Sequence, residues 1–479
     1  MKWDITQILA FIEAVFQQQP LDFVVLPLAG SDRRYGRFSI NGKSFIATYN
    51  PFIPENKAFI YFSRIFREKG LPVPEVLFVN ADQTMYIQTD LGNQALLDVL
   101  SEKGLNDDTY LLYQEAVKNL AKLQVVSDDG LDYNYCYAGS QFDKDAIIAD
   151  LNYFKYYFLR TQKIVYDGEQ LNHDFNTLAE WLVKFPLNFF MLRDCQARNI
   201  MVNEGKPYFI DFQGGKKGPL VYDIASLLWQ AKAALPLDWK NNLFDAYCKE
   251  LQKYLPNSLD VCQLKDYYNG FVLIRLLQVL GAYGFRGLFE KRQHFIESIP
   301  LALANLKSWL EACPITIDIP EISSILGKFT QDEFIQKFVT VKAKATSKLV
   351  VYISSFSYKK GIPADESGNG GGFVFDCRGI LNPGRFEAYK RLSGQDKAVQ
   401  EFLLTKTEMP QFLEHVKAIL DISIKDYLER DFGNLMVNFG CTGGQHRSVF
   451  AAETIQKYLQ QKFGVATVLL HSNQINWVR

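Results

Sequence analysis

The sequence predicts an α+β protein with a small β-rich lobe, a large helical lobe and, after them, a separate α/β domain. Residues 22–50 are rich in β-branched and aromatic residues on both sides of Asn41-Gly42, which is a hairpin signal. Apolar residues then recur at helical spacing over long segments: 106–126, 150–185 and 221–311. From Leu349 onward, short apolar runs alternate with helical stretches, which is typical of an α/β unit.

The bulk composition allows this architecture. The 479 residues suffice for about two to four domains, and 48% apolar residues can supply sizeable cores. A net charge of −1 gives no general argument for nucleic acid or membrane binding. Residues 340–479 hold about 18 Lys and Arg against about 13 Asp and Glu, a mildly basic balance that suits a phosphorylated ligand or RNA, or simply a solvated surface.

Cysteine usage and the termini bear on the compartment. The seven cysteines form no CxxC pair, which argues against a zinc site or a disulfide framework and favours a reducing compartment. The start, MKWDITQILAFIEAVF, is typical of an amphipathic helix rather than a signal peptide. The apolar run 271–285 contains Arg275 and does not reach the length of a membrane span. We therefore expect a cytoplasmic protein without a membrane partner.

The elements of the first lobe are expected to follow one another closely. FVVLPLAG and FSINGKSFIATYN are expected to be strands, with the polar loop GSDRRYGRF between these runs. A helix is expected over residues 55–69, because Pro72 and Pro74 break the pattern beyond it, and VLFV and TMYIQTDLG are expected to be two further strands. From Asn106 an Asn-Asp-Asp cap opens a long helix of the next lobe.

These patterns set the expected domain boundaries. Residues 1–91 form the β-rich lobe and residues 92–311 the helical lobe. The prolines of CPITIDIP and the charged run FTQDEFIQKFVTVKAKAT interrupt the helical rhythm, so residues 312–346 are expected to be a linker. The last domain covers residues 347–479, in which strand, helix and strand over 435–470 form a βαβ candidate.

One motif in the helical lobe has the residues that phosphoryl transfer needs. In FMLRDCQARNIMV an apolar run leads to Asp194 and then Asn199, and the strand PYFI ends at Asp211. Phosphoryl transfer requires a carboxylate beside the acceptor hydroxyl and oxygen ligands that hold Mg²⁺ across the phosphates. An Asp-x-x-x-x-Asn loop followed by a strand and Asp is the kinase arrangement of these parts. The same residue types are common in caps and turns, which leaves an ordinary loop as the alternative.

Residues 1–311 resemble the aminoglycoside phosphotransferase and choline kinase-like superfamily. Within it they are most similar to the bacterial anomeric sugar kinases that act on N-acetylmuramate and N-acetylglucosamine. The resemblance lies in five stretches: GSDRRYGRF, YIQTDLG, LRDCQARNIM, FIDFQGGKKGPLVYDIASLL and RLLQVLGAYGFRG. It implies a bilobal protein-kinase-like fold, ATP and Mg²⁺ as cofactors, and a sugar or amino sugar as acceptor.

The resemblance also implies roles for individual residues. Asp194 is expected to be the catalytic base and Asn199 and Asp211 the magnesium ligands, while Asp223 is expected to anchor the catalytic loop. Backbone N–H groups and arginines of the phosphate loop, Arg37 among them, would meet the negative charge of ATP. The residues expected to contact ATP, the first six at its phosphates and the last four at its adenine, are Gly30, Ser31, Asp32, Arg33, Arg34, Tyr35, Gln88, Thr89, Asp90 and Leu91.

The chain departs from that superfamily at three points. Leu192 stands where relatives usually carry His, and Cys195 and Gln196 replace an aromatic-His pair. The strand FIATYN has no lysine to pair with ATP, because Lys43 lies in the preceding turn. Arginines of the phosphate loop are candidates to replace that lysine. A pseudokinase scaffold that serves as a protein or RNA adapter is the alternative to an active kinase.

A second motif, GCTGGQHRS, follows the apolar run LMVNF and opens a helix. Glycines allow several backbone N–H groups to face one ligand, and a helix N-terminus adds partial positive charge, so the motif predicts an anion site, most naturally for phosphate. Cys441 and Arg447 also satisfy the C-x5-R pattern of a phosphatase, in which a thiolate attacks phosphorus. We favour binding, since Asp376 is the one visible candidate for the acid that a phosphatase needs.

Residues 349–479 resemble the C-terminal domain of the RNase adapter protein RapZ. The resemblance lies in SFSYKKGIP, FVFDCRGILNP, LSGQDKAVQEFL and GCTGGQHRSVFAAETI. That domain senses glucosamine-6-phosphate and presents a small RNA to an RNase, so the resemblance implies a site for a phosphorylated amino sugar. The residues implied are Cys441, Thr442, Gly443, Gly444, Gln445, His446, Arg447 and Ser448, with Asp376, Arg378, Lys359 and Asn382 around them.

The RNA role of that family has less support in this sequence. The chain ends in LLHSNQINWVR where RapZ relatives have a basic tail, and no GxxxxGK[ST] motif of their P-loop domain occurs. The lysines within 342–360 form a modest basic cluster that is more often a solvated face. We therefore expect a sugar kinase fused to a sensor domain. Amino-sugar availability, sensed at the second motif, would then tune the phosphorylation of a cell-wall amino sugar.

Overall fold

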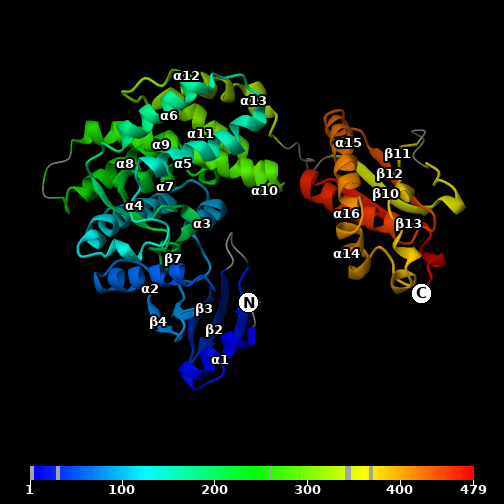
Figure 1. Cartoon of the computed structure of the whole chain (residues 1–479), viewed down its shortest axis with the longest axis horizontal. Coiled ribbons are helices and arrows are strands. Elements are labelled where there is room, and N and C mark those ends of the chain that lie inside the picture. The colour runs from blue at the N-terminus through cyan, green and yellow to red at the C-terminus, as the bar shows by residue number, and fades with distance from the viewer. Residues whose placement is uncertain are drawn as a thin grey trace. The chain divides into compact units, whose positions relative to one another are not determined.

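The chain folds into two compact units. The computed structural model describes residues 5–27, 33–255, 257, 260–290, 292–339, 347–365 and 371–478. Within it the units are Met1–Phe338 and Val339–Arg479, each with its own buried core (Figure 1). The first unit holds a small β-rich lobe and a large helical lobe, and the second is an α/β domain.

The small lobe is a five-stranded antiparallel sheet with a helix on each face. Its elements are α1 (Ile5–Phe16), β1 (Leu21–Val25), β2 (Arg34–Ile40), β3 (Lys43–Tyr49), α2 (Ile53–Glu68), β4 (Val76–Val79) and β5 (Met85–Thr89), with strand order β1-β2-β3-β5-β4. α1 buries Ile12 against Ile87, whereas α2 stacks Phe59 on Tyr86 with ring centroids 5.2 Å apart. Adjacent residues of a strand point to opposite faces, so β5 joins both helices to the sheet.

The turn between β2 and β3 is the predicted hairpin. Ile40 pairs with Lys43, and Asn41 and Gly42 between them have φ of +50° and +75°. Two consecutive left-handed residues are characteristic of a type I′ turn, which asparagine and glycine adopt at low cost. The hairpin leaves Lys43 exposed at the outer end of β3, while Tyr49 is buried at the inner end.

The helical lobe is built around one long apolar helix. Its helices are α3 (Leu96–Lys103), α4 (Asp107–Asp128), α5 (Lys144–Tyr157), α6 (Gly168–Leu182), α7 (Leu220–Leu228), α8 (Leu237–Leu251), α9 (Val261–Tyr283), α10 (Gln293–Ile296) and α11 (Ile299–Ala312). α9 packs against α5, α7 and α11 and is apolar on all sides, which is typical of a core helix. Among the described residues, Val261–Phe289 is the one helical stretch long and apolar enough to cross a bilayer, and 61% of its apolar window is buried inside the unit.

Two small antiparallel sheets interrupt the helices of this lobe. They pair β6 (Asn188–Met191) with β9 (Lys216–Pro219), and β7 (Ile200–Asn203) with β8 (Lys206–Phe209). The predicted strand-like runs around the first motif are these strands. Because each sheet has only two short strands, the loops at their ends are fixed by contacts with the surrounding helices.

The expected linker over residues 312–346 is wrong for residues 312–338, which belong to the first unit. α12 (Pro320–Phe329) and α13 (Asp332–Gln336) occupy this segment. One face of α12 is buried, at helical spacing: Ile322, Ile325, Leu326 and Phe329. Asp174 of α6 accepts hydrogen bonds from the first two amides of α12 at 2.7 and 3.0 Å, so a side chain distant in sequence caps this helix. Residues 340–346 lie outside the described residues.

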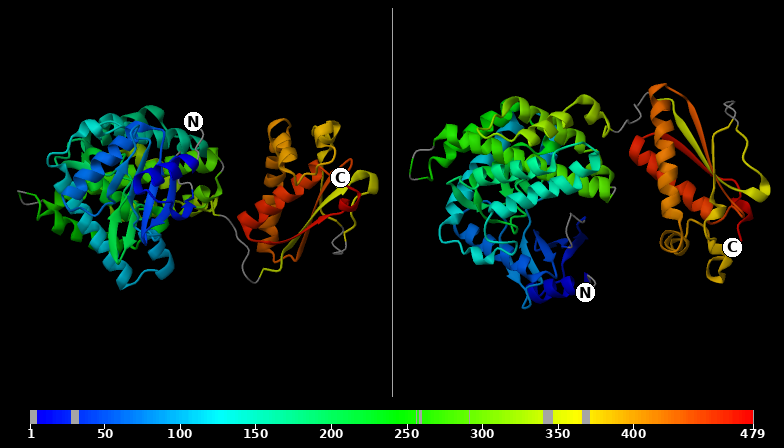
Figure 2. Two further views of the ribbon diagram at one scale, coloured as in Figure 1. Left: turned by 90° about the horizontal axis from the view of Figure 1, so that it is seen from below. Right: turned by 45° about the horizontal axis from the view of Figure 1, so that its top comes forward.

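The second unit is built on a parallel four-stranded sheet. Its elements are β10 (Val350–Ser357), β11 (Phe373–Asp376), α14 (Lys397–Thr405), α15 (Met409–Glu429), β12 (Asn434–Cys441), α16 (Arg447–Phe463) and β13 (Ala466–His471). The strand order is β11-β12-β10-β13, so β10 lies between the two strands of the predicted βαβ unit. α16 packs on the sheet with α15 alongside it (Figure 2). Four apolar side chains of the sheet remain exposed: Tyr352, Val374, Val468 and Leu470.

Candidate functional site

The residues of the first motif lie on two neighbouring loops of the helical lobe. Asp194 follows β6, Asn199 directly precedes β7, and Asp211 follows β8. The β7–β8 hairpin returns the chain to its starting point, and the Ile210 amide donates to the carbonyl oxygen of Asn199 at 3.0 Å. The hairpin therefore brings the two loops together.

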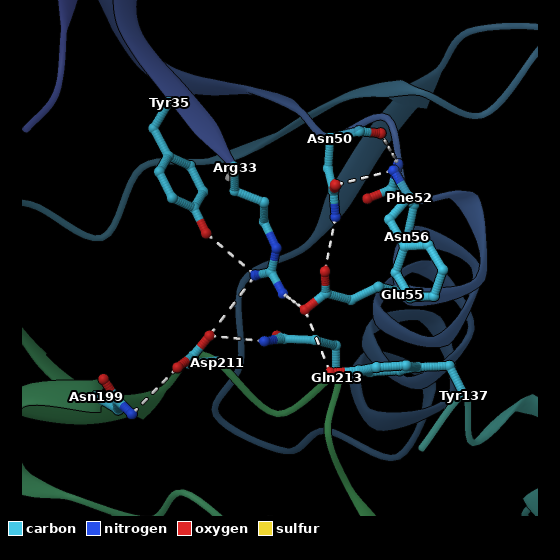
Figure 3. Close-up of polar contacts among 10 residues, drawn as sticks. All are labelled: Arg33, Tyr35, Asn50, Phe52, Glu55, Asn56, Tyr137, Asn199, Asp211 and Gln213. Carbon is cyan, nitrogen blue, oxygen red and sulfur yellow. Dashed lines mark hydrogen bonds and ion pairs between the residues drawn. The ribbon is translucent and has the colours of Figure 1, made fainter. Parts of the chain in front are cut away.

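The three residues meet at the side-chain amide of Asn199. Its Nδ2 donates to the backbone carbonyl oxygen of Asp194 at 2.9 Å and lies 3.4 Å from Oδ2 of the Asp211 side chain. Gln213 Nε2 donates to Oδ1 of Asp211 at 2.7 Å (Figure 3). With its nitrogen held in this way, Asn199 keeps its amide oxygen available, and 40% of the Asp211 side chain is exposed. The structure thus groups the predicted catalytic residue with both predicted metal ligands.

This donor set fits a cation that arrives with a nucleotide. Among the described residues, no three His, Cys, Asp or Glu side chains gather in one place, so the protein itself offers one carboxylate and one amide oxygen. Mg²⁺ commonly keeps several waters and takes substrate phosphates as its remaining ligands. Asp211 and Asn199 would hold the ion, which would neutralise charge on the phosphates.

Two residues of the site have a backbone conformation that L side chains rarely adopt. φ is +74° at Arg193 and +63° at Asp211. A non-glycine residue in such a conformation costs roughly 1–3 kcal/mol and persists where its surroundings enforce it. Arg193 immediately precedes Asp194, so both strained positions fall at the functional oxygens. The strain marks the same site that the motif predicts.

Asp223, in the first turn of α7, holds the catalytic loop by its backbone. The buried carboxylate accepts hydrogen bonds from the amides of Leu192 at 2.7 Å and Arg193 at 3.0 Å, and from Gln124 Nε2 at 3.1 Å. Burial raises the pKa of Asp223 to about 7, against the opposing effect of these donors. Because the carboxylate is fully buried, it can position the loop but cannot meet a substrate.

The departure at Leu192 is explained by the contacts of its neighbour. Leu192 is buried in the apolar core, where an imidazole would need a polar partner. Arg193 makes the polar contacts instead: its Nη2 donates to both oxygens of Asp150 at 2.7 and 2.8 Å. Its guanidinium also lies 4.8 Å from the ring centroid of Phe142. The loop is therefore held by an arginine rather than a histidine.

Arg275 is a residue of this site that the sequence analysis missed. It lies on α9, is 5% exposed, and places Nη2 3.6 Å from Oδ1 of Asp194. Its Nη1 donates to Gln278 at 2.8 Å. The available signal was a single charge inside the apolar run 271–285, since a buried charge requires a partner. Attraction between Arg275 and Asp194 limits the orientations of the catalytic carboxylate.

The residues expected at the ATP phosphates are only partly described. Gly30, Ser31 and Asp32 lie outside the described residues. Arg33 is buried and its Nη1 donates to the Tyr35 hydroxyl at 3.1 Å and lies 3.6 Å from Oδ1 of Asp211. Arg34 donates to the Arg33 carbonyl oxygen at 3.2 Å. The structure thus brings Arg33 and Tyr35 beside the predicted metal ligand.

The residues expected at the adenine lie where β5 passes into the helical lobe: Gln88, Thr89, Asp90 and Leu91. The Asp90 carboxylate is held by Arg37, whose Nε and Nη2 approach it at 2.7 and 2.9 Å, and by Ser44 Oγ at 2.6 Å. Arg37 therefore fixes this hinge and does not reach the phosphate side, in contrast to the expectation. Since the Asp90 side chain is occupied, contacts to adenine would come from the hinge backbone.

The residues of the second motif lie at the C-terminal edge of the parallel sheet. In register, Cys441 of β12 stands opposite Ser357 of β10, and Gly440 stands opposite Asp376 of β11. Lys359 follows in the turn after β10 and is exposed. Ligands of open α/β sheets bind outside the C-terminal ends of the strands. The fold therefore gathers the predicted set at the edge where a ligand site is expected.

The loop after β12 uses its carbonyl groups within the protein and leaves amides unused. The carbonyl oxygens of Thr442, Gly443 and Gly444 accept hydrogen bonds from Ser357 Oγ, Asn473 Nδ2 and Trp477 Nε1 at 2.7, 2.7 and 2.9 Å. In the part of the chain that the structure describes, the amides of Thr442, Gly443 and Gln445 meet no acceptor. Unused amides beside the N-terminus of a long helix are the donors of an anion-binding loop.

The polar side chains of this loop bind the protein itself, which differs from the expected role in anion binding. Each contacts backbone carbonyl oxygens of neighbouring segments: Gln445 those of Leu392 and Val478, His446 that of Tyr389, and Arg447 those of Arg378 and Ile380. All three are more than nine-tenths buried. Burial lowers the pKa of His446, so its ring is neutral near pH 7. Of these three described side chains, Arg447 alone has a buried polar atom without a partner, its Nε.

The contacts of Asp376 favour binding over a phosphatase, whereas those of Cys441 do not distinguish the two roles. Sγ of Cys441 is buried and lies 3.1 Å from Ser448 Oγ, while the Gly444 amide donates to it at 3.2 Å. Arg378 Nε donates to both carboxylate oxygens of Asp376 at 2.9 Å, and this hydrogen bonding lowers the pKa of Asp376. A carboxylate held ionised is a poor general acid. Arg378 and Asp376 are both exposed.

The two lobes and the grouped loop residues define a protein-kinase-like phosphotransferase domain, and the second unit is an α/β domain with an anion-binding loop. Family models identify both. Residues 39–256 match the phosphotransferase enzyme family, and residues 349–474 match the RapZ C-terminal domain. The chain therefore joins a phosphotransferase-family domain to a RapZ C-terminal domain, the combination that the sequence predicts.

Curated relatives carry the name nucleotide-binding protein. One from Dictyoglomus thermophilum is 33% identical over 184 residues, 38% of this chain and 59% of the relative. One from Moorella thermoacetica is 40% identical over 113 residues, 24% of this chain and 36% of the relative. The chain thus spans less than two thirds of the length of these relatives.

Solved structures that superpose on part of this chain include those of two kinases. Amicoumacin kinase hAmiN in complex with AMP-PNP, Ca²⁺ and Ami is 13% identical with a TM-score of 0.47, over 67% of this chain and 97% of that one. Choline kinase LicA from Streptococcus pneumoniae is 12% identical with a TM-score of 0.42, over 63% of this chain and 98% of that one.

Proposed function

We propose that the chain is an ATP- and Mg²⁺-dependent kinase that phosphorylates a hydroxyl of a small sugar, with N-acetylmuramate- and N-acetylglucosamine-type amino sugars as acceptors. The observation that carries the proposal is the grouping of Asp194, Asn199 and Asp211 on two adjacent loops. ATP supplies the phosphoryl group. Asp194 accepts the proton of the acceptor hydroxyl, whose oxygen attacks phosphorus, and Asn199 and Asp211 hold the metal ion.

Exposure and fixation of the catalytic groups support this assignment. The Asp194 side chain is 52% exposed, so a sugar hydroxyl can reach it, whereas Arg275 beside it is buried. Asp223 fixes the backbone in front of Asp194 through two amides. Such a site contributes chiefly by positioning reactants and stabilising charge, which is how phosphoryl transfer is catalysed.

The test is the release of ADP from ATP and Mg²⁺ with a panel of acceptors. The panel contains N-acetylglucosamine, N-acetylmuramate, glucosamine, choline and an aminoglycoside, and ³¹P NMR of the product identifies the hydroxyl that is phosphorylated. We expect turnover with the N-acetylated amino sugars and slower or no turnover with the cationic acceptors. Turnover with choline or aminoglycoside alone would contradict the acceptor class, and no turnover with any acceptor would contradict a kinase.

We further propose that the RapZ C-terminal domain binds an amino-sugar phosphate such as glucosamine-6-phosphate. The unused amides of Thr442, Gly443 and Gln445 beside α16 support an anion at this loop. Calorimetric titration of the full chain with glucosamine-6-phosphate is expected to show binding, with weaker binding of glucose-6-phosphate and none of glucosamine. Repeating the ADP assay with glucosamine-6-phosphate present tests whether this domain tunes the kinase rate.

An adapter without kinase activity is the second candidate, because β3 has no inward lysine and Lys43 is exposed at its outer end. It predicts nucleotide binding without turnover, together with retention of a small RNA on a filter. A C-terminal phosphatase is the third, and it predicts phosphate release that Cys441→Ser abolishes. Phosphate release that survives Cys441→Ser would exclude the thiolate mechanism.

A further inference from the structure

Arg33 and Glu55 form a buried ion pair inside the small lobe. Arg33 directly precedes β2, and Glu55 lies in the first turn of α2; their side chains are 4% and 15% exposed, and Nη2 of Arg33 contacts Oε1 of Glu55. Removing one partner of such a pair leaves an uncompensated buried charge, so the pair persists only if both groups are held in place. Figure 3 shows the guanidinium between Glu55 on one side and Asp211 on the other.

Glu55 is held rigidly from two directions. Asn50 Nδ2 donates to Oε2 of Glu55 at 2.8 Å, and Asn50 is itself fixed because its Oδ1 accepts from the Phe52 amide at 3.0 Å. From the helical lobe, the Tyr137 hydroxyl lies 3.4 Å from Oε1 of Glu55. A negative charge in the first turn of α2 is also favoured by the helix dipole. Glu55 is therefore an orienting partner rather than a mobile surface acid.

The side of the Arg33 guanidinium that faces away from Glu55 has unused N–H donors and points at the predicted metal ligand, Asp211. Its Nη1 lies 3.6 Å from Oδ1 of Asp211 and donates to the Tyr35 hydroxyl at 3.1 Å. Its Nε is buried and has no partner among the described atoms. A guanidinium has five N–H donors in a fixed fork that matches phosphate oxygens. A buried arginine with unsatisfied donors beside a metal-binding carboxylate is placed to receive an anion that arrives with the metal ion.

β3 offers no alternative cation for this anion. Its single basic residue, Lys43, is exposed at the hairpin, and the inner half of the strand carries small, hydroxyl and apolar side chains only: Ile46, Ala47, Thr48 and Tyr49. Arg33 reaches the same region from the residue before the neighbouring strand, since β2 and β3 pair along their whole length from Arg34 opposite Tyr49. The position that a lysine of β3 could fill is therefore occupied by an arginine that directly precedes the adjacent strand.

We infer that Arg33 is the residue that positions the phosphates of ATP and that Glu55 orients it, in place of a lysine of β3. The inference rests on the proposed kinase function. In the described state Arg33 lies against Asp211 and offsets its charge. With ATP and Mg²⁺ bound, Asp211 would hold the metal ion, and Arg33 would keep its contact with Glu55 while its free donors contact phosphate oxygens.

The test compares nucleotides that differ in phosphate content. Calorimetry on the full-length chain with Mg²⁺ measures the affinity for ATP, ADP and adenosine in Arg33→Met, Arg33→Lys and Arg64→Met. Arg64 is the matched control because it lies on α2 and is 65% exposed, with weak contacts to Glu68 at 3.8 Å and to the Tyr61 ring centroid at 5.9 Å. We expect Arg33→Met to lower the affinity for ATP about 10- to 100-fold and the affinity for adenosine less than about twofold, since hydrogen bonds between charged groups and phosphate are strong. Arg33→Lys should recover part of the loss.

Glu55→Gln keeps the test decisive if Arg33→Met fails to fold, as judged by circular dichroism. This variant should lower the affinity for ATP by a smaller factor than Arg33→Met does. The double variant Arg33→Met, Glu55→Gln should lower the affinity for ATP no more than Arg33→Met alone, because the two residues act as one unit. Equal weakening of ATP and adenosine, or additive losses, would overturn the inference while the kinase proposal stands. If the native chain binds no ATP, the proposed function itself fails.

Discussion

The two loops at Asp194 and at Cys441 carry similar sequence signals but use their side chains in opposite ways. Both follow an apolar strand and contain several polar residues within a few positions. At the first loop and its neighbour, the side chains of Asp194 and Asp211 are partly exposed, so a ligand can reach them. At the second, Gln445, His446 and Arg447 are buried against backbone carbonyl groups, and the backbone amides remain unused.

The difference follows from the charge of the ligand at each site, which is a cation and a proton at the first and an anion at the second. A site that moves a proton and holds a cation needs carboxylate oxygens, which only side chains supply. A site that only holds an anion can use backbone amides, and its side chains are then free to fix the loop. The polar residues of a motif can therefore be the reactive groups in one domain and the internal supports in another, depending on their tertiary partners.

The largest expected effect is that of Asp194→Asn, which removes the proton acceptor of the first loop. Turnover should fall by about 10²- to 10⁴-fold, because this is the usual contribution of general base catalysis. The affinity for ATP should change little, since Asn199 and Asp211 remain. The measurements are the ADP release assay and calorimetry with ATP.

The control for Asp194→Asn is Asp107→Asn, an equal change at an exposed position in the first turn of α4. It should leave turnover unchanged. Should Asp194→Asn retain native turnover, the first loop would resemble the second, with its side chains serving only as supports, and the contrast between the loops would disappear.

The next effect concerns the support of the first loop and its dependence on pH. Burial raises the pKa of Asp223 to about 7 from the ordinary 3.8. Between these values the folded state keeps a proton that the unfolded state releases, so the free energy of unfolding should fall as pH rises from about 4 to about 7 and level off above. The slope contributed by this one group has a ceiling of about 1.4 kcal/mol per pH unit.

Asp223→Asn isolates that contribution. The variant should be less stable by roughly 2–4 kcal/mol near neutral pH, because the Leu192 and Arg193 amides donate to different oxygens of Asp223 and one of these becomes an NH2 donor in Asn. Its stability should also vary less between pH 4 and 7. Urea unfolding can be followed by tryptophan fluorescence, since four of the tryptophans, Trp181, Trp229, Trp239 and Trp309, lie in the described part of the first unit. An unchanged pH slope would show that Asp223 is ionised in the folded state throughout this range.

Most of the fold could be predicted from local patterns. The Asn41-Gly42 turn, the Asn106 cap and the glycine-rich loop after β12 each act through their own residues, and the structure has the hairpin, helix and strand–loop–helix that they predict. The segment 312–338 was mispredicted because its prolines and charges suggested a connector. α12 forms there because its apolar face finds the core and Asp174 caps it, and both partners are distant in sequence.

The site could be predicted in its residue types but not in its contacts. Asp194, Asn199 and Asp211 were found because their spacing reflects a local hairpin. Arg275 and Glu55 were missed because they reach the site from helices far along the chain, and no spacing connects them to it. The orientation of the Arg447 side chain toward the protein interior was missed for the same reason, since its hydrogen-bond acceptors belong to the segment 378–380.

A smaller effect is expected from Arg447→Met in the second loop. The change leaves two buried carbonyl oxygens, those of Arg378 and Ile380, without their donor, so the second unit should lose roughly 2–3 kcal/mol of stability. Hydrogen exchange of the amides in β11 and α16 would report this loss locally. Loss of glucosamine-6-phosphate binding with native hydrogen exchange would instead show that Arg447 contacts the ligand, and the proposed contrast with the first loop would be wrong.

The smallest effect should follow Arg378→Met at the rim of the same site. Arg378 is half exposed, pairs with Asp376 and lies 3.8 Å over the ring of Tyr358, so solvent screens its attraction for an anion. Affinity for glucosamine-6-phosphate should fall by only about two- to fivefold, and the remaining affinity should depend less on salt. Arg430→Met is the matched control, because Arg430 is an exposed arginine on the same unit that is paired with Asp426 at 3.1 Å. A loss of more than about fiftyfold would mean that exposed side chains, rather than backbone amides, supply most of the binding, and the second site would then work as the first one does.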